Sequence, residues 1–234
     1  MMIKLEMSEA LGKQIRKGDV SEHAIPNLDM VSQAIRTGRT DEALEFLEYA
    51  FNESKANNDS LVSFVETVLT HLASFGEQEV EKILRQRYYP MRKDWLSVTR
   101  SVEESLQRCT ESQRKHPASL RVIEEPDRYV VTYDPCGSGG RLRRTRSVGT
   151  TKQAYPWSWG EAGVSYYCSH CCISYEIIPI ELWGYPIKIH LLGAKPEDPC
   201  IHLFYKNPEL IPEEYFTRVG MKKDMAILQG GKVE

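Results

Sequence analysis

The chain has 234 residues, of which 41% are hydrophobic, so it is long and apolar enough to build one large domain or two modest ones. Its formal net charge of −3 gives no reason to expect nucleic acid or an anionic membrane surface as a partner. The sequence holds no apolar run of about eighteen residues, the length that predicts a membrane span. Residues 1–17 lack the apolar core of a signal peptide, so we expect a cytoplasmic protein.

Four parts are expected along the chain. Residues 1–25 are polar and weakly patterned, and we interpret them as an N-terminal arm. Apolar residues then recur every three or four positions over 26–117, which predicts a helical domain. Over 118–220 the pattern changes to period two with β-branched residues, and 221–234 is a polar tail that we expect to be loose. The predicted class is α+β: an N-terminal helical bundle, followed by a mostly antiparallel, loop-rich β domain that carries a cysteine metal site.

Four helices are expected in the helical domain. Thr40 is a candidate N-cap for the first of them, and residues 57–60 are expected to end that helix and to cap the next. Gly76 is the expected stop of the second helix, Pro90 ends or kinks the third, and a fourth follows from Trp95.

Short runs with alternating or β-branched residues predict the strands of the second half. No long helical pattern separates them, which favours antiparallel pairing. The expected strands are 120–123, 129–133, 164–167, 174–178, 187–191 and 201–205.

The cysteines are the most informative residues of the sequence. Cys168 and Cys171 form a C-x-x-C pair, which places two thiolates on one turn, and Cys172, the next residue after the pair, is a further candidate ligand that could replace one member of the set. Cys136 and Cys200 each end an Asp-Pro-Cys tripeptide beside a predicted strand, so the sheet can bring both to the C-x-x-C turn. In a reducing compartment such clustering is more typical of metal binding than of structural disulfides.

The sulfur-rich ligand set favours a zinc ion, with an iron–sulfur cluster or iron as the alternative. Two other interpretations stay open. The thiols form a redox pair, or they are buried and act as small apolar side chains. Cys109 lies at helical spacing from Leu106, and we expect it in the core.

Several residues near the cysteines are candidates for proton transfer or for ligation. His170 lies inside the motif and is expected to act as a ligand, as an acid and base, or as a hydrogen-bond partner of a ligand. His202 shares a strand face with the last cysteine of the set, whereas His190 is expected to be a strand histidine with a hydrogen-bond partner. Glu161 and Glu176 are the nearest carboxylates and are the candidate general bases.

A glycine-rich loop follows the first cysteine of the set. In Gly137, Ser138, Gly139 and Gly140 successive backbone N–H groups can form an anion nest, and Arg141 adds a guanidinium fork. This pattern predicts a site for a small anionic molecule beside the metal. The alternatives are a hairpin loop with solvated arginines, or glycines that let the backbone pack tightly around the metal.

Together these segments predict a small-molecule metalloenzyme of the lyase or hydrolase type, which forms a homodimer through its helical domain. The aromatic residues of 155–167 either wall its pocket or fill the core beneath it. Two other functions are weighed against it. One is a non-enzymatic zinc protein that senses metal or redox state or is structural, and the other is an iron–sulfur redox protein.

Overall fold

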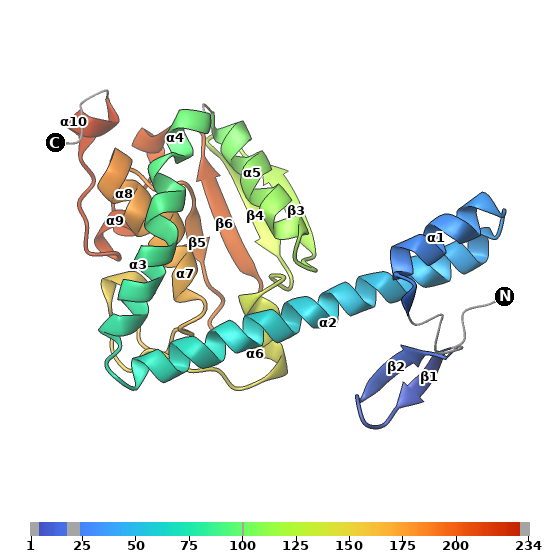
Figure 1. Cartoon of the computed structure of the whole chain (residues 1–234). Coiled ribbons are helices and arrows are strands. Elements are labelled where there is room, and N and C mark those ends of the chain that lie inside the picture. The colour runs from blue at the N-terminus through green and yellow to red at the C-terminus, as the bar shows by residue number, and fades with distance from the viewer. Residues whose placement is uncertain (1–4, 18–23, 100, 230–234) are drawn as a thin grey trace. The chain divides into compact units, whose positions relative to one another are not determined.

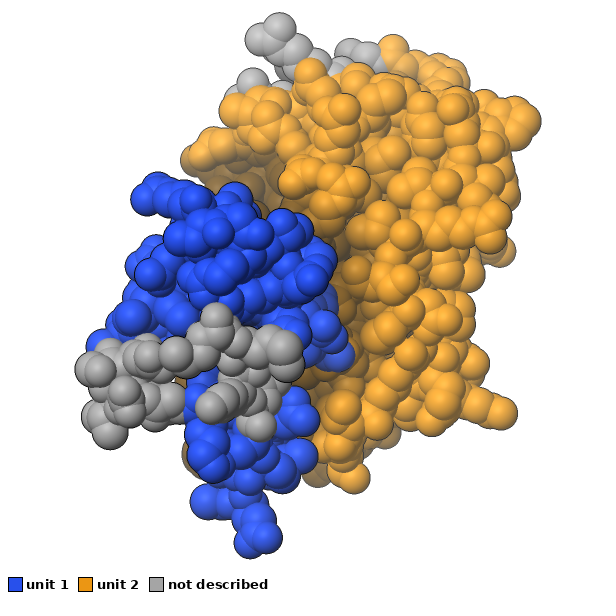
Figure 2. Space-filling model, turned by 90° about the vertical axis from the view of Figure 1, so that its right-hand side faces the viewer, with its two compact units in different colours: residues 1–57 blue, residues 58–234 orange. Residues whose placement is uncertain are grey.

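The computed structural model describes residues 5–17, 24–99 and 101–229. The chain divides into two compact units, residues 1–57 and 58–234 (Figure 2). The fold mixes helices with antiparallel sheets, which confirms the mixed character of the predicted class. The division does not coincide with the expected boundary at 117, because the helices after residue 57 belong to the same unit as the sheet.

The unit of residues 1–57 begins with a two-stranded antiparallel hairpin inside the expected polar arm. Strand β1 (Leu5–Ser8) pairs with β2 (Lys13–Arg16), and α1 (Asn27–Arg36) and the first part of α2 (Thr40–Ala73) follow. The remaining parts of the arm, 1–4 and 18–23, lie outside the described residues, as do residues 230–234 of the expected loose tail.

Helix α2 corrects the expected break at 57–60. It starts at Thr40, as predicted, but runs without interruption to Ala73. Polar residues weaken a helix interior by only tenths of a kcal/mol each, so hydrogen bonds to residues distant in the sequence can outweigh their low helix propensity. Asn58 forms such a bond, because its Nδ2 donates to the carbonyl oxygen of Gly137 at 2.8 Å.

The next helices also differ from the expected ones at their ends. Helix α3 (Gln78–Lys93) continues through Pro90, which removes one backbone hydrogen bond, and ends three residues later, within one turn of the proline. The expected fourth helix is two pieces, α4 (Trp95–Val98) and α5 (Val102–Arg114). Ser101 caps α5 by accepting from the backbone N–H of Glu104.

One four-stranded antiparallel sheet, in the order β3-β4-β6-β5, organises the unit of residues 58–234 (Figure 1). Its register sets Tyr133, at the end of one strand, opposite Cys200, and sets His190 opposite His202. The alternation pattern thus predicted four of the six expected strands. They are β3 (Leu120–Glu124), β4 (Arg128–Tyr133), β5 (Ile189–Leu191) and β6 (Cys200–Tyr205).

The other two expected strands are wrong. Residues 164–167 form turns, with one isolated bridge at Ser165, and the segment 174–178 is helical. All residues from Ile173 to Ile180 are buried, so their apolar character lacks the alternation that separates a strand from a buried helix. The segment consists of α7 (Ser169–Cys172), the π-helical turn η3 (Ile173–Ile177) and α8 (Ile178–Trp183).

Short elements complete the fold. Part of the tail expected to be loose is helical, and a Cβ on Gly184 would lie 2.5 Å from a methyl carbon of Ile227 in that helix. The remaining elements are α6 (Gly139–Thr145), η2 (Pro156–Ser158), η4 (Pro208–Leu210), α9 (Glu214–Thr217) and α10 (Met225–Leu228). Among the helices of the described ranges, none is both long and apolar enough to cross a membrane.

The main core cluster packs α2 and α3 against the α7–α8 segment (Figure 1). Leu69 of α2 and Val80 and Leu84 of α3 meet Ile173 and Ile177, all of them buried. This packing fixes the turn that carries the C-x-x-C pair.

Two buried glutamates fasten the segment that leads to this turn. The carboxylate of Glu66 accepts from the backbone N–H groups of Gly149 and Tyr167, at 2.7 and 3.1 Å. Glu77 accepts from the hydroxyl of Tyr155 and the backbone N–H of Lys152, both at 2.8 Å.

Glu77 predicts a pH-dependent contribution to stability. Burial raises its pKa, but hydrogen bonds from Tyr166, Lys152 and Tyr155 outweigh that effect and lower the pKa below its ordinary value of 4.5. A carboxyl group whose pKa is lowered by folding adds stability above its unfolded pKa, and this is lost as the pH falls through the folded pKa. Glu77→Gln is therefore expected to cost about 1–3 kcal/mol of unfolding free energy at neutral pH. Unfolding titrations of both proteins across pH should show the difference shrink below pH 4.5. A constant difference would contradict this role.

Candidate functional site

A small cavity in the unit of residues 58–234 collects the four cysteines that the sequence assigns to one site. Its volume is about 30 Å³, room for an ion or a water molecule but far below that of a pocket for a larger molecule. Cys136, Cys168, Cys171 and Cys200 all line it. They are free thiols and come from three distant stretches of the chain.

The fold explains how these stretches meet. Cys168 and Cys171 flank the start of α7, Cys200 opens β6, and Cys136 follows the end of β4, the strand paired with β6. The glycines of the loop permit the close approach. A Cβ on Gly139 would lie 2.7 Å from the sulfur of Cys168, and one on Gly140 would lie 2.9 Å from the Cβ of Cys136. These contacts favour the interpretation that the glycines let the backbone pack around the cysteines.

Three histidines line the same cavity, and burial lowers the pKa of all three, so their rings are neutral at pH 7. The Nδ1 of His170 is within hydrogen-bond distance of the carbonyl oxygen of Tyr167. A carbonyl only accepts, so this nitrogen carries the proton. The Nε2 of His170 therefore presents a lone pair, 3.4 Å from the sulfur of Cys171.

His190 presents a second lone pair to the cavity. Its Nδ1 lies 3.0 Å from Oε1 of Glu176, which also accepts from the indole N–H of Trp159 at 2.8 Å. The other oxygen of Glu176 accepts from Arg218 at 2.6 Å. Glu176 thus holds the proton of His190 on Nδ1, and the buried Nε2 has no hydrogen-bond partner among the residues that the structure describes. A carboxylate behind a histidine is the arrangement that orients imidazole ligands in metal sites.

Burial keeps the thiols of Cys168, Cys171 and Cys200 protonated at neutral pH in the absence of a metal. Burial raises the pKa of Cys171 to about 11 and also raises the pKa of Cys168 and Cys200, with a further rise at the last two from neighbouring thiolates. Burial lowers the pKa of Lys188, but the negative charges of Cys109 and other neighbours, when ionised, raise it above its ordinary value. Thiols whose protons are retained by burial and mutual repulsion ionise when a metal ion supplies the compensating charge.

The side chains do not yet form a coordination shell. Among the residues that the structure describes, no group of three or more His, Cys, Asp or Glu side chains is placed so that it could hold a metal ion as it stands. Binding would require these side chains to move from the positions they have in this structure.

Other predicted site residues lie outside the cavity. The sulfur of Cys172 donates to the carbonyl oxygen of Pro156 at 3.4 Å, so this cysteine faces away from its neighbours in the motif. Glu161 is exposed, and Glu176 lies behind His190 instead of in the cavity wall. Cys109 is in the core, as predicted.

The glycine loop divides between the cavity and the protein around it. Ser138, Gly139 and Gly140 line the cavity, whereas the carbonyl of Gly137 accepts from Asn58. The guanidinium of Arg141 forms a two-pronged ion pair with Asp59, so it is occupied within the protein.

Sequence reasoning missed Arg143, the arginine of the loop that does line the cavity and that donates to the carbonyl of Gly193 at 3.0 Å. It also missed Lys188 and the lone pair of His190. The one signal in the sequence is the strand alternation of Ile189, His190 and Leu191, which predicts that Lys188 and His190 lie on or beside a strand. Compared with protein-family models, curated proteins and solved structures, this chain matches none of them.

Proposed function

We propose that the unit of residues 58–234 binds a thiophilic transition-metal ion, zinc in the first place, in the cysteine-lined cavity. The observation that carries the proposal is the convergence of Cys136, Cys168, Cys171 and Cys200 on a space of about 30 Å³. Thiolates are the ligands that zinc prefers in closed sites, and four of them complete a tetrahedral shell. The unpartnered Nε2 of His190 supports the same assignment, because a buried imidazole nitrogen without a partner is costly unless a ligand completes it.

The residues fit the metal in defined roles. The four cysteines supply the sulfur donors, and His170 or His190 supplies an imidazole lone pair that can replace one of them. Glu176 fixes the ring of His190.

Metal content of anaerobically purified protein tests the proposal. We expect about one zinc per chain without visible colour, and loss of that zinc when all four cavity cysteines are changed to serine. The matched control is the double variant Cys109→Ser/Cys172→Ser, which removes two buried thiols outside the cavity and should keep the metal. Metal-free wild-type protein after purification and after incubation with zinc would contradict the proposal. If the purified protein contains iron and sulfide instead of zinc, the site binds an iron–sulfur cluster.

A second candidate function, the metalloenzyme of the lyase or hydrolase type, is favoured by one further group. The side-chain oxygen Oε1 of Gln113 is buried at the cavity, and no described residue donates a hydrogen bond to it. A water molecule or a substrate hydroxyl would supply one. Zinc with an open position acts as a Lewis acid or lowers the pKa of water. Arg143, in place of Arg141, is the guanidinium available to a small anionic molecule at the cavity.

Cobalt substitution separates this enzyme from a closed structural or sensing site. If one position is open, azide added to the cobalt-loaded protein should change its visible spectrum, because the anion enters the coordination shell. An unchanged spectrum at high azide would remove the enzyme and leave the structural or sensing zinc protein.

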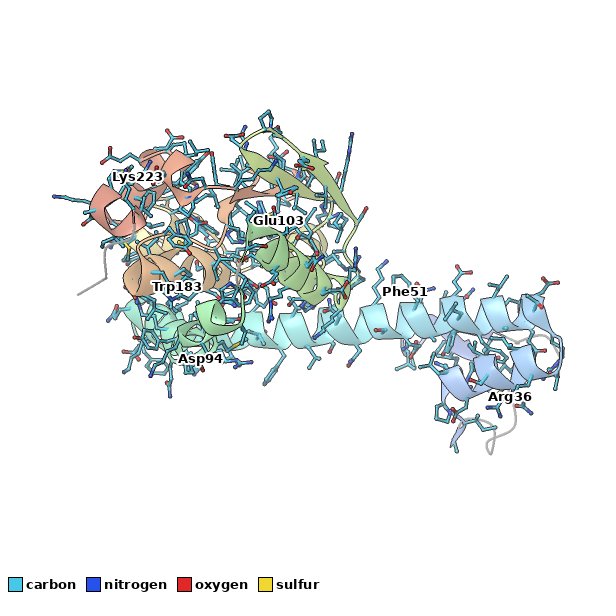
Figure 3. The ribbon with its side chains drawn as sticks, turned by 90° about the horizontal axis from the view of Figure 1, so that it is seen from above. Arg36, Phe51, Asp94, Glu103, Trp183 and Lys223 are labelled. Atoms are coloured by element: carbon cyan, nitrogen blue, oxygen red, sulfur yellow. The ribbon has the colours of Figure 1, made fainter. Side chains whose placement is uncertain are left out.

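We also propose that a second copy of the chain covers an apolar face of α2. Leu61, Phe64, Val65 and Val68 are each at least 40% exposed, although the adjacent face of the same helix is buried in the core. Positions 61, 65 and 68 have the three- and four-residue spacing of a two-helix seam. On the part of α2 in the other unit, Phe51 is 58% exposed (Figure 3).

Light scattering after gel filtration tests the dimer. Wild-type protein is expected at twice the 26.9 kDa chain mass, and Leu61→Glu/Val68→Glu at the chain mass. Thr67→Glu adds a charge on the same helix at an exposed polar position and should stay dimeric. A wild-type monomer at tens of micromolar would refute the dimer.

A further inference from the structure

Lys188 is a buried cation in the wall behind the cysteine cavity. Its side chain is almost fully buried, and its Nζ lies 4.0 Å from the ring centroid of Tyr175. Within the described part of the chain, no carboxylate pairs with it. Burying an ammonium group without a counter-charge is costly, so its surroundings have to supply negative charge when the protein works.

The polar contact of Lys188 is the ring of His202. Its Nζ lies 3.1 Å from Nδ1 of His202, which is itself buried. A lysine ammonium has three donors and no acceptor, so Nδ1 of His202 accepts. The single proton of the neutral ring is therefore on Nε2, and Nε2 lies 3.4 Å from the sulfur of Cys200.

His202 is thus opposite in tautomer to the other two cavity histidines. His170 and His190 place their Nδ1 protons on oxygen acceptors, which leaves a lone pair on each Nε2. The ring of His202 packs in an edge-to-face contact with that of His190, with 4.3 Å between centroids. At neighbouring positions, the Nε2 of His202 therefore donates a hydrogen bond, whereas the Nε2 of His190 offers a lone pair.

We infer that Lys188 acts through His202 to direct an N–H hydrogen bond onto the sulfur of Cys200, and that His202 is therefore not a metal ligand. The inference rests on the proposed metal site and assigns any imidazole ligation there to His170 or His190. Lys188 and His202 are positioning residues for the Cys200 thiolate.

The hydrogen-bonded chain from Lys188 through His202 to the sulfur of Cys200, called the Lys188 relay below, also helps to balance the charge of the site. Three or four thiolates around a divalent cation carry one or two more negative than positive charges. Lys188 behind the cavity and Arg143 in its wall supply two buried or partly buried positive charges to offset them. Hydrogen bonds to ligating sulfur and the net charge around it tune metal affinity and, for a redox metal, the potential.

Nuclear magnetic resonance on protein with nitrogen-15 histidine, loaded with cadmium-113, tests the inference without any substitution. The expected result is a proton on Nε2 of His202, no coupling from cadmium to that ring, and a proton on Nδ1 of His170 and of His190. Cadmium coupling to a His202 nitrogen, or a His202 proton on Nδ1, would overturn the inference.

A variant supplies an independent measurement. Lys188→Met removes the donor to His202 and should weaken zinc binding, measured by competition with a chelating dye, by about 10- to 100-fold. Lys206→Met is the matched control, because Lys206 pairs with Glu124 outside the cavity and its loss should leave zinc affinity unchanged. Unchanged affinity in a folded Lys188→Met protein would count against the relay.

The two proposals fail differently. If wild-type protein binds neither cadmium nor zinc, the metal site is refuted. The proton position of His202 in the metal-free protein then still decides whether the Lys188 relay exists.

Discussion

Zinc is expected to raise the thermal unfolding midpoint of the wild-type protein by roughly 5–10 °C, and Cys168→Ser/Cys171→Ser should abolish that shift. A ligand at about 100 times its dissociation constant stabilises the folded state by about 2.7 kcal/mol. For a domain of this size each kcal/mol moves the midpoint by roughly 2–4 °C. The double variant removes the two thiols of one turn, so its midpoint should respond neither to zinc nor to a chelator. Differential scanning calorimetry with and without each additive measures the effect.

Cys172→Ser is the matched control for this experiment. It changes the adjacent cysteine, whose sulfur donates to the carbonyl oxygen of Pro156, and a serine hydroxyl can form the same bond. Its zinc-dependent shift should therefore equal that of the wild type. A shift that persists in Cys168→Ser/Cys171→Ser, or a wild-type midpoint that ignores both zinc and chelator, would contradict the assignment of the cavity.

Glu176→Ala is expected to lower the free energy of unfolding by about 3–5 kcal/mol, the cost of removing one partner from a buried ion pair. Glu176 is fully buried, and its two oxygens accept from Arg218, His190 and Trp159. Alanine leaves the charge of Arg218 and the N–H groups of His190 and Trp159 without their acceptor. Burial raises the pKa of Glu176 against the opposing effect of Arg218, so its ion pair depends on this partner. Urea unfolding of the metal-free proteins measures the difference.

Glu161→Ala provides the comparison. Both glutamates are candidate general bases by sequence, but Glu161 is exposed, and its loss should change the unfolding free energy by no more than about 0.5 kcal/mol. If Glu176→Ala unfolds within about 1 kcal/mol of the wild type, Glu176 does not hold His190 in the way described here.

The sheet was predictable from the sequence because its strands alternate. The segments 120–123, 129–133, 187–191 and 201–205 carry that pattern and lie in β3, β4, β5 and β6 or next to them. The run at 174–178 is apolar because it is buried on every side. Such a run shows no repeat of apolar and polar residues, so a helix cannot be told from a strand by its pattern.

The cysteine assembly was predictable in part. Strand pairing was enough to expect Cys136 and Cys200 near the C-x-x-C turn, and all four cysteines do line one cavity. That Cys172 lies outside the cavity was not predictable. It faces away because a helical turn points adjacent residues in different directions, and the sequence did not predict a helical turn there. Whether the four bind a metal stays a prediction.

The orienting groups of the histidines lay beyond sequence reasoning. Glu176 and His190 are fourteen residues apart, and Lys188 reaches His202 across the strand pair of β5 and β6. Such contacts depend on side-chain direction in the folded sheet. The arginines show the same limit: Asp59, which neutralises Arg141, lies 82 residues away on α2.

X-ray absorption at the zinc edge of the loaded protein identifies the ligand atoms themselves, so it shows whether the cavity cysteines hold the metal. We expect three or four sulfur neighbours at about 2.3 Å, with any remaining ligand an imidazole nitrogen at about 2.0–2.1 Å. A shell made only of nitrogen and oxygen atoms would show that the cysteines of the cavity do not hold the metal.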